Sequence, residues 1–267
     1  MHRFLAVLAV SAIAAAAGGA GPAYTAAGIV NVSNYTAGPF APNSVLALFG
    51  TGLSTAARAL GPEDIRNGTL PMQLNYTQVY VDNTPVPLFY VSEGQINFVV
   101  PGNQIPGDVK VRVVRQGWTG PEVTITLVDA APALFESPEG YVVATHLDWS
   151  VVTPEAPARG GETVVVYATG LGKANPNPGV GEIPSYAAQL LWRQDLTVTV
   201  GGTAVSAACI LYAGVTPSSA GLYQINLVLD EGLAADPELR VGLRGGWSRA
   251  GLKLAVKAPQ PSAGDAR

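Results

Sequence analysis

The stretch Gln95-Ile96-Asn97-Phe98-Val99-Val100 decides how this sequence is interpreted, because the chain contains it twice. It returns, slightly changed, as Gln224-Ile225-Asn226-Leu227-Val228-Leu229. A second phrase precedes each copy, since Phe-Gly-Thr-Gly-Leu at 49–53 is echoed by Tyr-Ala-Thr-Gly-Leu at 167–171. Two phrases repeated in the same order predict a duplicated unit. Apolar residues alternate within each Gln-Ile-Asn copy, so we expect each copy to form a central β-strand.

The spacing of the repeats indicates where the two units differ. Gln95 and Gln224 are 129 positions apart, as are Trp118 and Trp247, whereas the Gly-Leu turns are 118 apart. The second unit therefore gains about 11 residues in its loops. The alternation of apolar residues slips by one step before the tryptophans, which predicts a β-bulge near Val113 in one copy.

Composition favours short strands over helices. The chain of 267 residues has 31 Gly and 21 Pro, and only 13% of its residues are charged, against about 25% in average soluble domains. Each unit shows about seven short apolar runs separated by turn residues, which is typical of a β-sandwich. We therefore predict an all-β protein with two tandem immunoglobulin-like antiparallel sandwiches. The expected bounds are 24–129 and 130–257, joined at 130–133, with a flexible tail at 258–267.

The N-terminus predicts export. A short basic start, an apolar run at 4–17 and small residues before Ala20 and Ala23 are typical of a signal peptide, here placed at 1–23. An uncleaved anchor is the alternative. No later segment is long and apolar enough to span a membrane. The net charge of −4 argues against nucleic acid as a partner. Cys209 is the only cysteine, and its apolar neighbours predict a buried, inert thiol.

Several motifs together are similar to one known family. Gly-Ile-Val-Asn-Val-Ser-Asn-Tyr at 28–35, the two repeated phrases, Pro-Ala-Leu-Phe at 132–135 and the segment 157–172 resemble the uncharacterised C-terminal domain family of secreted acidobacterial (Solibacter-type) proteins. The resemblance covers 28–257, and it departs from the family pattern at Gly160 and Asp230. Each half also resembles an IPT/TIG immunoglobulin-like domain. The resemblance implies a secreted module with no assigned activity.

Catalytic and metal-binding signals are weak. The only histidine beyond the leader is His146, beside Asp148, and no Gly-x-Ser-x-Gly elbow would present a nucleophile to it. We therefore interpret His146 as a surface strand residue. Asp230, Glu231 and Asp236 could form a loose calcium clip, but a solvated turn is the simpler interpretation. We expect no catalytic residues, metal or cofactor. A spatially assembled carboxylate pair, as in glycoside hydrolases, is the enzymatic alternative.

Aromatic and amide residues remain as candidates for binding or for structure. Trp118 and Trp247 occupy similar glycine-flanked turns and are the candidate ligand-binding residues, with plugs over the ends of the sandwiches as the alternative. Four further residues recur at fixed places in the repeats, and their amides are expected to bond unpaired backbone near the turns or the joint: Gln95, Asn97, Gln224 and Asn226. Gly50, Gly52 and Gly170 are expected in turns that need positive φ.

These features predict a secreted, non-catalytic interaction module or cell-surface structural module, with an unknown protein or glycan at the cell surface as its partner. The alternative is a carbohydrate-binding module that assists extracellular glycan breakdown.

Overall fold

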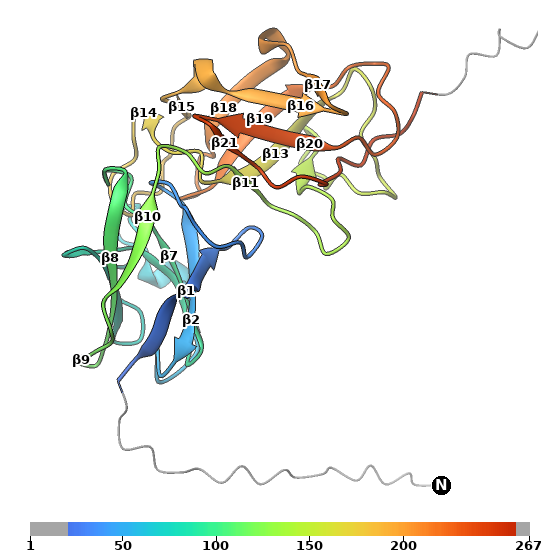
Figure 1. The fold of residues 1–267 in the computed structure, drawn as a ribbon. Coiled ribbons are helices and arrows are strands. Elements are labelled where there is room, and N and C mark those ends of the chain that lie inside the picture. The colour runs from blue at the N-terminus through green and yellow to red at the C-terminus, as the bar shows by residue number, and fades with distance from the viewer. Residues whose placement is uncertain (1–20, 260–267) are drawn as a thin grey trace, which may run out of the picture.

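The computed structural model describes residues 21–259 and shows two β-sandwiches in tandem, the first running from blue to green and the second from yellow to red (Figure 1). The predicted fold class is confirmed: apart from three short 3₁₀ helices, the regular elements of the described residues are β-strands, and all paired strands are antiparallel. Of the signal peptide predicted at 1–23, residues 1–20 lie outside the described residues, as do residues 260–267 of the tail predicted at 258–267.

The first sandwich consists of two five-stranded sheets. One sheet has the order β1 (Ala23–Asn31), β2 (Val45–Thr51), β7 (Gln95–Val99), β6 (Leu88–Val91) and β3 (Arg58–Ala59). The other has the order β10 (Val123–Leu127), β8 (Gly107–Arg115), β4 (Thr77–Val81) and β5 (Thr84–Pro85), with β9 (Trp118–Thr119) also paired to β8. A short 3₁₀ helix, η1 (Pro62–Asp64), lies between β3 and β4.

The second sandwich repeats this order of strands. Its larger sheet contains β11 (Ala133–Leu134), β13 (Thr163–Thr169), β19 (Tyr223–Val228), β18 (Ile210–Val215), β15 (Ala188–Leu190) and β14 (Ala174–Asn175), with β12 (Ala144–Thr145) also on β13. Its smaller sheet contains β17 (Thr203–Ala204), β16 (Thr197–Val200), β20 (Leu239–Leu243) and β21 (Gly246–Trp247). The 3₁₀ helices η2 (Arg193–Asp195) and η3 (Ala207–Cys209) complete it.

The two Gln-Ile-Asn stretches are central strands, as predicted. Strand β7 lies between β2 and β6, and β19 lies between β13 and β18. Their apolar residues point inward because side chains alternate between the two faces of a strand. Ile96 and Phe98 are fully buried in one core, and Ile225 and Leu227 are fully buried in the other. Each sandwich therefore has a hydrophobic core of its own.

The segment 79–91 does not form a simple hairpin. Its two apolar runs, separated by the turn residues 82–84, predict one, with Pro85 and Pro87 placing the second strand at a sheet edge. Instead β4 turns into the two-residue edge strand β5, and the chain then crosses to the opposite sheet as β6. Strand β6 lies between β7 and β3. Pro85 and Pro87 lie where the chain crosses from one sheet to the other. Proline has no backbone N–H, and at this point no hydrogen bond of a strand ladder is lost.

The predicted β-bulge near Val113 is also wrong. Strand β8 pairs with β4 and with β10 without any shift of register. The register shift lies elsewhere, between Leu88 and Tyr90 on β6, and an equivalent shift lies between Ile210 and Tyr212 on β18. Both sandwiches therefore carry a bulge beside the Gln-Ile-Asn strand.

The repeated glycines have two different roles. Gly52 and Gly170 have φ of 63° and 74°, as predicted for the Gly-Leu turn. Gly50 does not have a positive φ, so that expectation is wrong for this residue. A Cβ at Gly50 would collide with the carbonyl oxygen of Ala23 on the neighbouring strand. Glycine is required at position 50 because two backbones approach closely there, and not because the turn needs a positive φ.

The two sandwiches are joined through the Thr-Gly-Leu turn of the second. The buried hydroxyl of Thr169 accepts a hydrogen bond from the Val45 backbone N–H at 3.1 Å and donates one to the Gly221 carbonyl at 2.9 Å. On the first sandwich, the Asn43 side-chain amide donates to the Gly172 carbonyl at 3.3 Å. Since these groups are buried, each bond satisfies a polar atom that water cannot reach.

Loops of the second sandwich extend this contact. Leu70 donates its N–H to Gly181 and Ile183 donates to Gly68, both at 2.8 Å, so a loop of the second sandwich pairs with the first. Val45, Leu70 and Val99 form a small apolar cluster, against which Ile183 and Ala220 pack. The loop at 216–222 is longer than its counterpart at 92–94, as predicted, and it carries Ala220 into the joint.

Two smaller observations concern exposure and length. Cys209 is only partly buried in η3, so the prediction of a buried thiol is wrong. Within residues 21–259, no helix has the length and apolar character needed to cross a membrane.

Thr169→Val tests the joint. Valine keeps the shape but removes the hydroxyl, which leaves the Val45 N–H and the Gly221 carbonyl without this partner. We expect the free energy of unfolding to fall by about 1–3 kcal/mol, measured by urea denaturation. The matched control is Thr51→Val, the same residue of the repeated phrase in the first sandwich. Thr51 is exposed, so its change should stay within about 0.5 kcal/mol. Equal effects of the two substitutions would contradict this account.

Candidate functional site

The two predicted tryptophans lie beside similar tight turns and are about half exposed. Trp118 is 54% exposed after the turn Gln116-Gly117, and Trp247 is 48% exposed near the turn Arg244-Gly245. All four turn residues have positive φ, between 48° and 84°. This is the type I′ geometry that joins two antiparallel strands through two residues.

The tryptophans do not occupy equivalent positions in these hairpins. Trp118 is the first residue after its turn and pairs with Arg115, whereas Trp247 is the second and pairs with Gly242. Because paired residues project from the same face, Trp118 lies on the face of the buried Val113, beyond the end of the core. Trp247 lies on the outer face of its sheet. The one-step slip in the sequence therefore reflects a displaced tryptophan and not a bulge.

Trp247 is held flat against its sheet. A Cβ built at Gly242 would lie 2.8 Å from the indole ring, so only glycine leaves room for the ring there. The guanidinium of Arg240 lies 5.1 Å from the ring centroid, a cation–π contact. The indole is thus fixed in orientation while half of its surface stays accessible. It does not plug the end of the sandwich.

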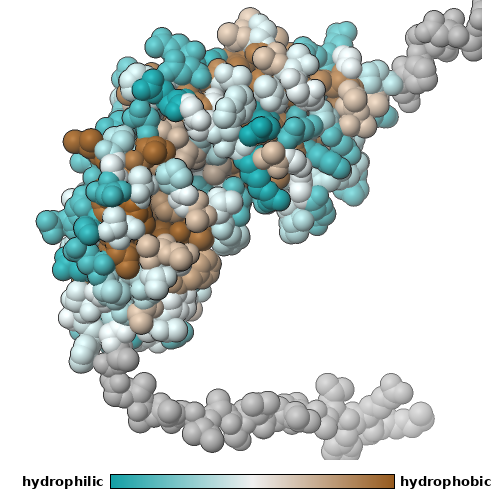
Figure 2. Space-filling view, viewed as in Figure 1, coloured by the Kyte–Doolittle hydropathy of each residue, from teal (hydrophilic) through white to brown (hydrophobic). Residues whose placement is uncertain are grey.

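A groove of about 620 Å³ lies beside Trp247 where the two sandwiches meet. Its walls come from the turn after β1, the connecting segment and the β20–β21 turn. The polar side chains that line it are Asn31, Asn34, Thr36, Arg244 and Arg249. The space-filling view from this side shows hydrophobic residues gathered mainly over the first sandwich (Figure 2). The groove combines an aromatic ring, amides, a hydroxyl and guanidinium groups, and no carboxylate lines it.

The repeated amides pair with each other, which corrects the expectation that they bond backbone. Gln95 Nε2 donates to Asn97 Oδ1 at 2.8 Å, and Gln224 Nε2 donates to Asn226 Oδ1 at 3.0 Å. Each pair runs along the outer face of its strand, since the residues between them point into the core. We call these two pairs the amide ladders. They have the same geometry in both sandwiches.

Aromatic rings flank both amide ladders in matching register. Phe49 is opposite Gln95 and Tyr90 is opposite Asn97; in the second sandwich Tyr167 is opposite Gln224 and Tyr212 is opposite Asn226. The tyrosines come from the strand that carries the bulge. Phe49 is 39% exposed, and the three tyrosines are partly exposed. Each sandwich therefore presents an outer face with an amide ladder between two aromatic rings.

A further pair of matching aromatics escaped the sequence analysis. Each sandwich has a hairpin on the strand beside β2 or β13, closed by the bridge Val30–Ala37 or Thr145–Val151. Tyr35 and Trp149 lie at their tips, 61% and 69% exposed, with φ of 55° and 71°. The sequence does contain a signal for this pair, because Asn-Tyr-Thr at 34–36 and Asp-Trp-Ser at 148–150 have the same order of side-chain types.

The same local bonds build both hairpin tips. Asn34 Oδ1 accepts from the N–H and the hydroxyl of Thr36 at 3.1 and 2.7 Å. Asp148 Oδ1 accepts from the N–H and the hydroxyl of Ser150 at 3.0 and 2.6 Å. These turns leave the aromatic residue between the two polar ones with its side chain in solvent.

His146 is not the surface strand residue that we expected. It follows β12, is partly buried, and contacts Glu162 through Nδ1, while Nε2 lies 3.2 Å from the Ala156 carbonyl. Both ring nitrogens thus face acceptors, which favours the doubly protonated ring. The hydrogen bond to the Glu162 carboxylate raises the pKa of His146 above 6.5. Asp148 instead binds Ser150.

Among residues 21–259 there is no group of three or more His, Cys, Asp or Glu side chains placed to hold a metal ion. Of the three acids considered for a calcium clip, Asp236 accepts a hydrogen bond from the Tyr141 hydroxyl at 2.9 Å. The other two, Asp230 and Glu231, are exposed beside a turn, as the solvated-turn interpretation predicts.

Comparison with protein families gives one match. Residues 32–127 match the IPT/TIG domain family, and this segment lies within the first sandwich. The match supports the predicted immunoglobulin-like character of that sandwich; the resemblance to the acidobacterial family stays a prediction. A comparison with curated proteins finds no match.

Solved structures with similar folds are distant in sequence. The surface glycan-binding protein SGBP-B of the Bacteroides ovatus mixed-linkage glucan utilization locus is 11% identical with a TM-score of 0.33, covering 82% of this chain and 43% of that one. SGBP-B of a Bacteroides uniformis xyloglucan locus is 12% identical with a TM-score of 0.27, covering 88% and 49%. The Escherichia coli adhesin FdeC is 14% identical with a TM-score of 0.25, covering 86% and 63%. The chain spans less than half the length of the two glycan-binding proteins.

The His146–Glu162 contact predicts a pH-dependent stability. Because the folded-state pKa of His146 is raised, its stabilisation is complete below the unfolded value near 6.5 and is lost as the pH rises through the folded pKa. The melting temperature of the wild type should therefore exceed that of His146→Gln by the largest margin at pH 5.5, and the margin should shrink by pH 8.5. A margin that is constant or grows with pH would refute the assignment.

Proposed function

We propose that this chain is an extracellular, non-catalytic recognition module that binds a carbohydrate in the groove at the joint, with Trp247 as the stacking platform. The observation that carries the proposal is the indole of Trp247 at the edge of that groove, 48% exposed and held in place by its contacts with Gly242 and Arg240. A preorganised aromatic ring loses little conformational entropy when a ligand packs on it.

The composition of the groove supports a sugar as ligand. Asn31, Asn34 and Thr36 supply amide and hydroxyl groups on one wall, opposite the ring. Arg244 is neutralised by Asp129 and Asp195 at 3.1 and 3.2 Å, and Arg249 by Glu136 at 2.6 Å. The guanidinium groups therefore act as oriented hydrogen-bond donors more than as a net positive field. A volume of a few hundred Å³ lies in the range of small-ligand sites.

The joint supports a rigid scaffold for this groove. Hydrogen bonds from Val45 to the Thr169 hydroxyl, from Asn43 and from Leu70 cross between the sandwiches, and an apolar cluster packs at the contact. Since the walls of the groove belong to both sandwiches, a fixed joint keeps them at a constant separation. We infer that the two sandwiches arose by duplication, because β2–β7–β6 and β13–β19–β18 have the same order and similar sequences.

Export is part of the proposal. Of the two cleavage positions considered, the one after Ala20 leaves the first sandwich intact, because Ala23 pairs with Thr51 in β1 and Pro22 lies against Gly120. We therefore place the signal peptide at 1–20 and the sandwiches at 21–129 and 130–257. The runner-up function is a structural or protein-binding module at the cell surface, for which the same exposed aromatics would serve.

Trp247→Ala tests the proposed site on an array of neutral and acidic glycans. We expect the wild type to retain at least one glycan class and Trp247→Ala to bind it at least tenfold more weakly, which corresponds to about 1.4 kcal/mol. The matched control is Trp118→Ala, which removes an equally exposed indole from outside the groove and should leave affinity unchanged. Wild-type silence on every glycan would favour the protein-binding alternative. Equal losses in both variants would remove the groove as the site.

A further inference from the structure

The backbone at Trp149 suits a different residue. Its φ of 71° lies in the left-handed region, where a bulky side chain is disfavoured and Gly or Asn is preferred. The side chain is 69% exposed, so it contributes little to the hydrophobic core. Trp149 therefore adopts an unfavourable backbone conformation whose cost is not offset by burial of its side chain. Backbone strain of this kind gathers at functional sites.

The first sandwich carries the same unfavourable choice at the same place. Tyr35 has a φ of 55° and is 61% exposed, and its ring centroid lies 6.2 Å from that of Phe49 on the outer face. Each exposed aromatic donates its backbone N–H back to the start of its hairpin: Tyr35 to the Asn31 carbonyl four residues earlier at 2.8 Å, and Trp149 to the His146 carbonyl three residues earlier at 3.1 Å. Two hairpins built alike, each holding an exposed ring, point to a repeated role for that ring.

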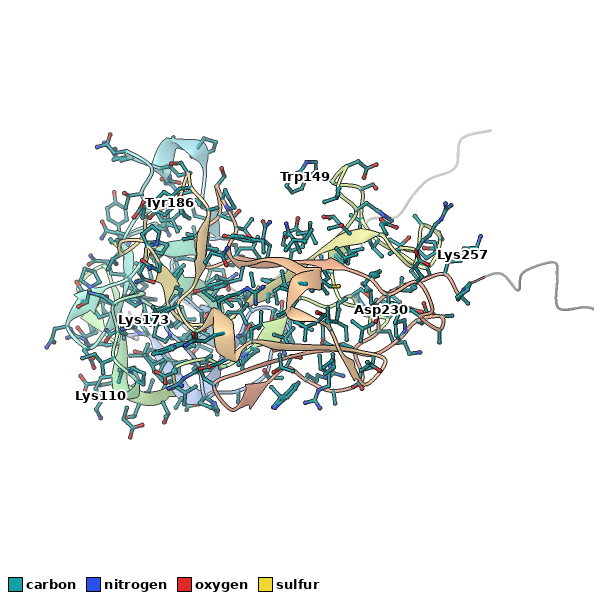
Figure 3. The ribbon with its side chains drawn as sticks, turned by 90° about the horizontal axis from the view of Figure 1, so that it is seen from above. Lys110, Trp149, Lys173, Tyr186, Asp230 and Lys257 are labelled. Atoms are coloured by element: carbon teal, nitrogen blue, oxygen red, sulfur yellow. The ribbon has the colours of Figure 1, made fainter. Side chains whose placement is uncertain are left out.

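Both hairpins border the faces that carry the amide ladders. Across one row of the second sandwich the paired residues are Val151, Thr145, Val165, Asn226 and Tyr212. The equivalent row of the first is Ala37, Val30, Ala47, Asn97 and Tyr90. Neighbouring strands are about 4.8 Å apart, so each row extends roughly 19 Å from the hairpin to the far tyrosine. Figure 3 shows Trp149 and Tyr186 on the same side of the second sandwich, each on a segment that rises above it.

The chemistry of these rows is uncharged. Neither row contains Lys, Arg, Asp or Glu. Each amide ladder uses one N–H and one carbonyl oxygen internally. Gln224 is buried, so the group that both sandwiches leave for an outside partner is the amide nitrogen of the partly exposed Asn97 or Asn226. Neutral donors and acceptors between aromatic rings suit a ligand with hydroxyl groups at its rim and C–H groups on its face, which is a neutral sugar.

We propose that these outer faces are two equivalent binding faces for a neutral oligosaccharide chain, with Tyr35 and Trp149 packing on sugar rings and the amide ladders bonding hydroxyl groups. This inference rests on the proposed carbohydrate-binding function. The face beside Trp149 lies outside the joint groove, whereas the hairpin of Tyr35 also lines that groove through Asn34 and Thr36, so Trp149→Asn is the variant that separates the two proposals. The rigid joint holds the two faces in a fixed relation, so the module binds glycan at two places and gains affinity for long or surface-bound chains through avidity.

The test uses Tyr35→Asn and Trp149→Asn, because asparagine suits the left-handed backbone and removes the ring. The probes are cellohexaose, xylohexaose and mannohexaose, with oligogalacturonate as the charged comparison. In a Trp247→Ala background, which disables the groove, titration calorimetry should give a stoichiometry near two for one neutral probe. Either substitution should reduce it to near one, and both together should abolish binding. Oligogalacturonate should bind at least tenfold more weakly.

Stability separates a binding role from a structural one. Both variants should melt at the wild-type temperature or about 2 °C above it, because strain is relieved. A matched control is Tyr76→Asn, since Tyr76 is 67% exposed with a φ of 57° but lies next to β4, away from either ladder. It should leave binding unchanged.

Three outcomes would overturn the inference: a fall in melting temperature of more than about 4 °C in either variant, unchanged stoichiometry, or an equal effect of Tyr76→Asn. If Trp247→Ala alone removes all binding and the hairpin variants bind like wild type, the proposed groove stands and the two faces do not. If the hairpin variants lose binding and Trp247→Ala does not, the faces stand and the groove falls.

Discussion

The hydroxyl of Thr169 connects three separate parts of the chain. It accepts from the Val45 N–H in β2 of the first sandwich and donates to a loop of the second, and Thr169 is fully buried. The relative position of the sandwiches depends on this bond, on the Asn43 amide and on the paired backbone at 68–70 and 181–183. A groove with walls from both sandwiches keeps its shape only if that position is constant. The joint is therefore the constraint on which any binding at the groove depends.

The outer faces show how one local solution serves both sandwiches. The amide ladder, the bulge on the next strand and the Asx-turn hairpin occur twice in the same register. The bulge shifts Tyr90 and Tyr212 into register with the asparagines, while the hairpins place exposed rings at the opposite side of the face. None of these features is required to bury the core, which is formed by the residues between them. They belong to the outer surface of each sandwich and not to its core.

Much of the architecture could be predicted because it follows from local pattern. The alternation at 95–100 and 224–229 identified the central strands, and the repeated phrases identified the number of sandwiches. The bulge and the equivalence of Trp118 and Trp247 could not be predicted, since a match of Gly-Trp letters does not reveal which residue pairs with which. The exposed pair Tyr35 and Trp149 was missed for a related reason. The triplets Asn-Tyr-Thr and Asp-Trp-Ser contain similar side chains but no identical residue. Only the backbone geometry shows that they form the same turn.

The sequence by itself determined the all-β class, the tandem arrangement, the central strands and the positive-φ glycines Gly52 and Gly170, because each depends on neighbours in the chain. The tertiary structure alone decided the roles of identical residues in the two copies. Thr51 and Thr169 stand at the same place in the repeated phrase, yet one is exposed and the other is buried between the sandwiches. The physical reason is that only the second copy has another sandwich packed against that turn. Because Thr169 is buried there, its hydroxyl takes part in a hydrogen bond between the two sandwiches.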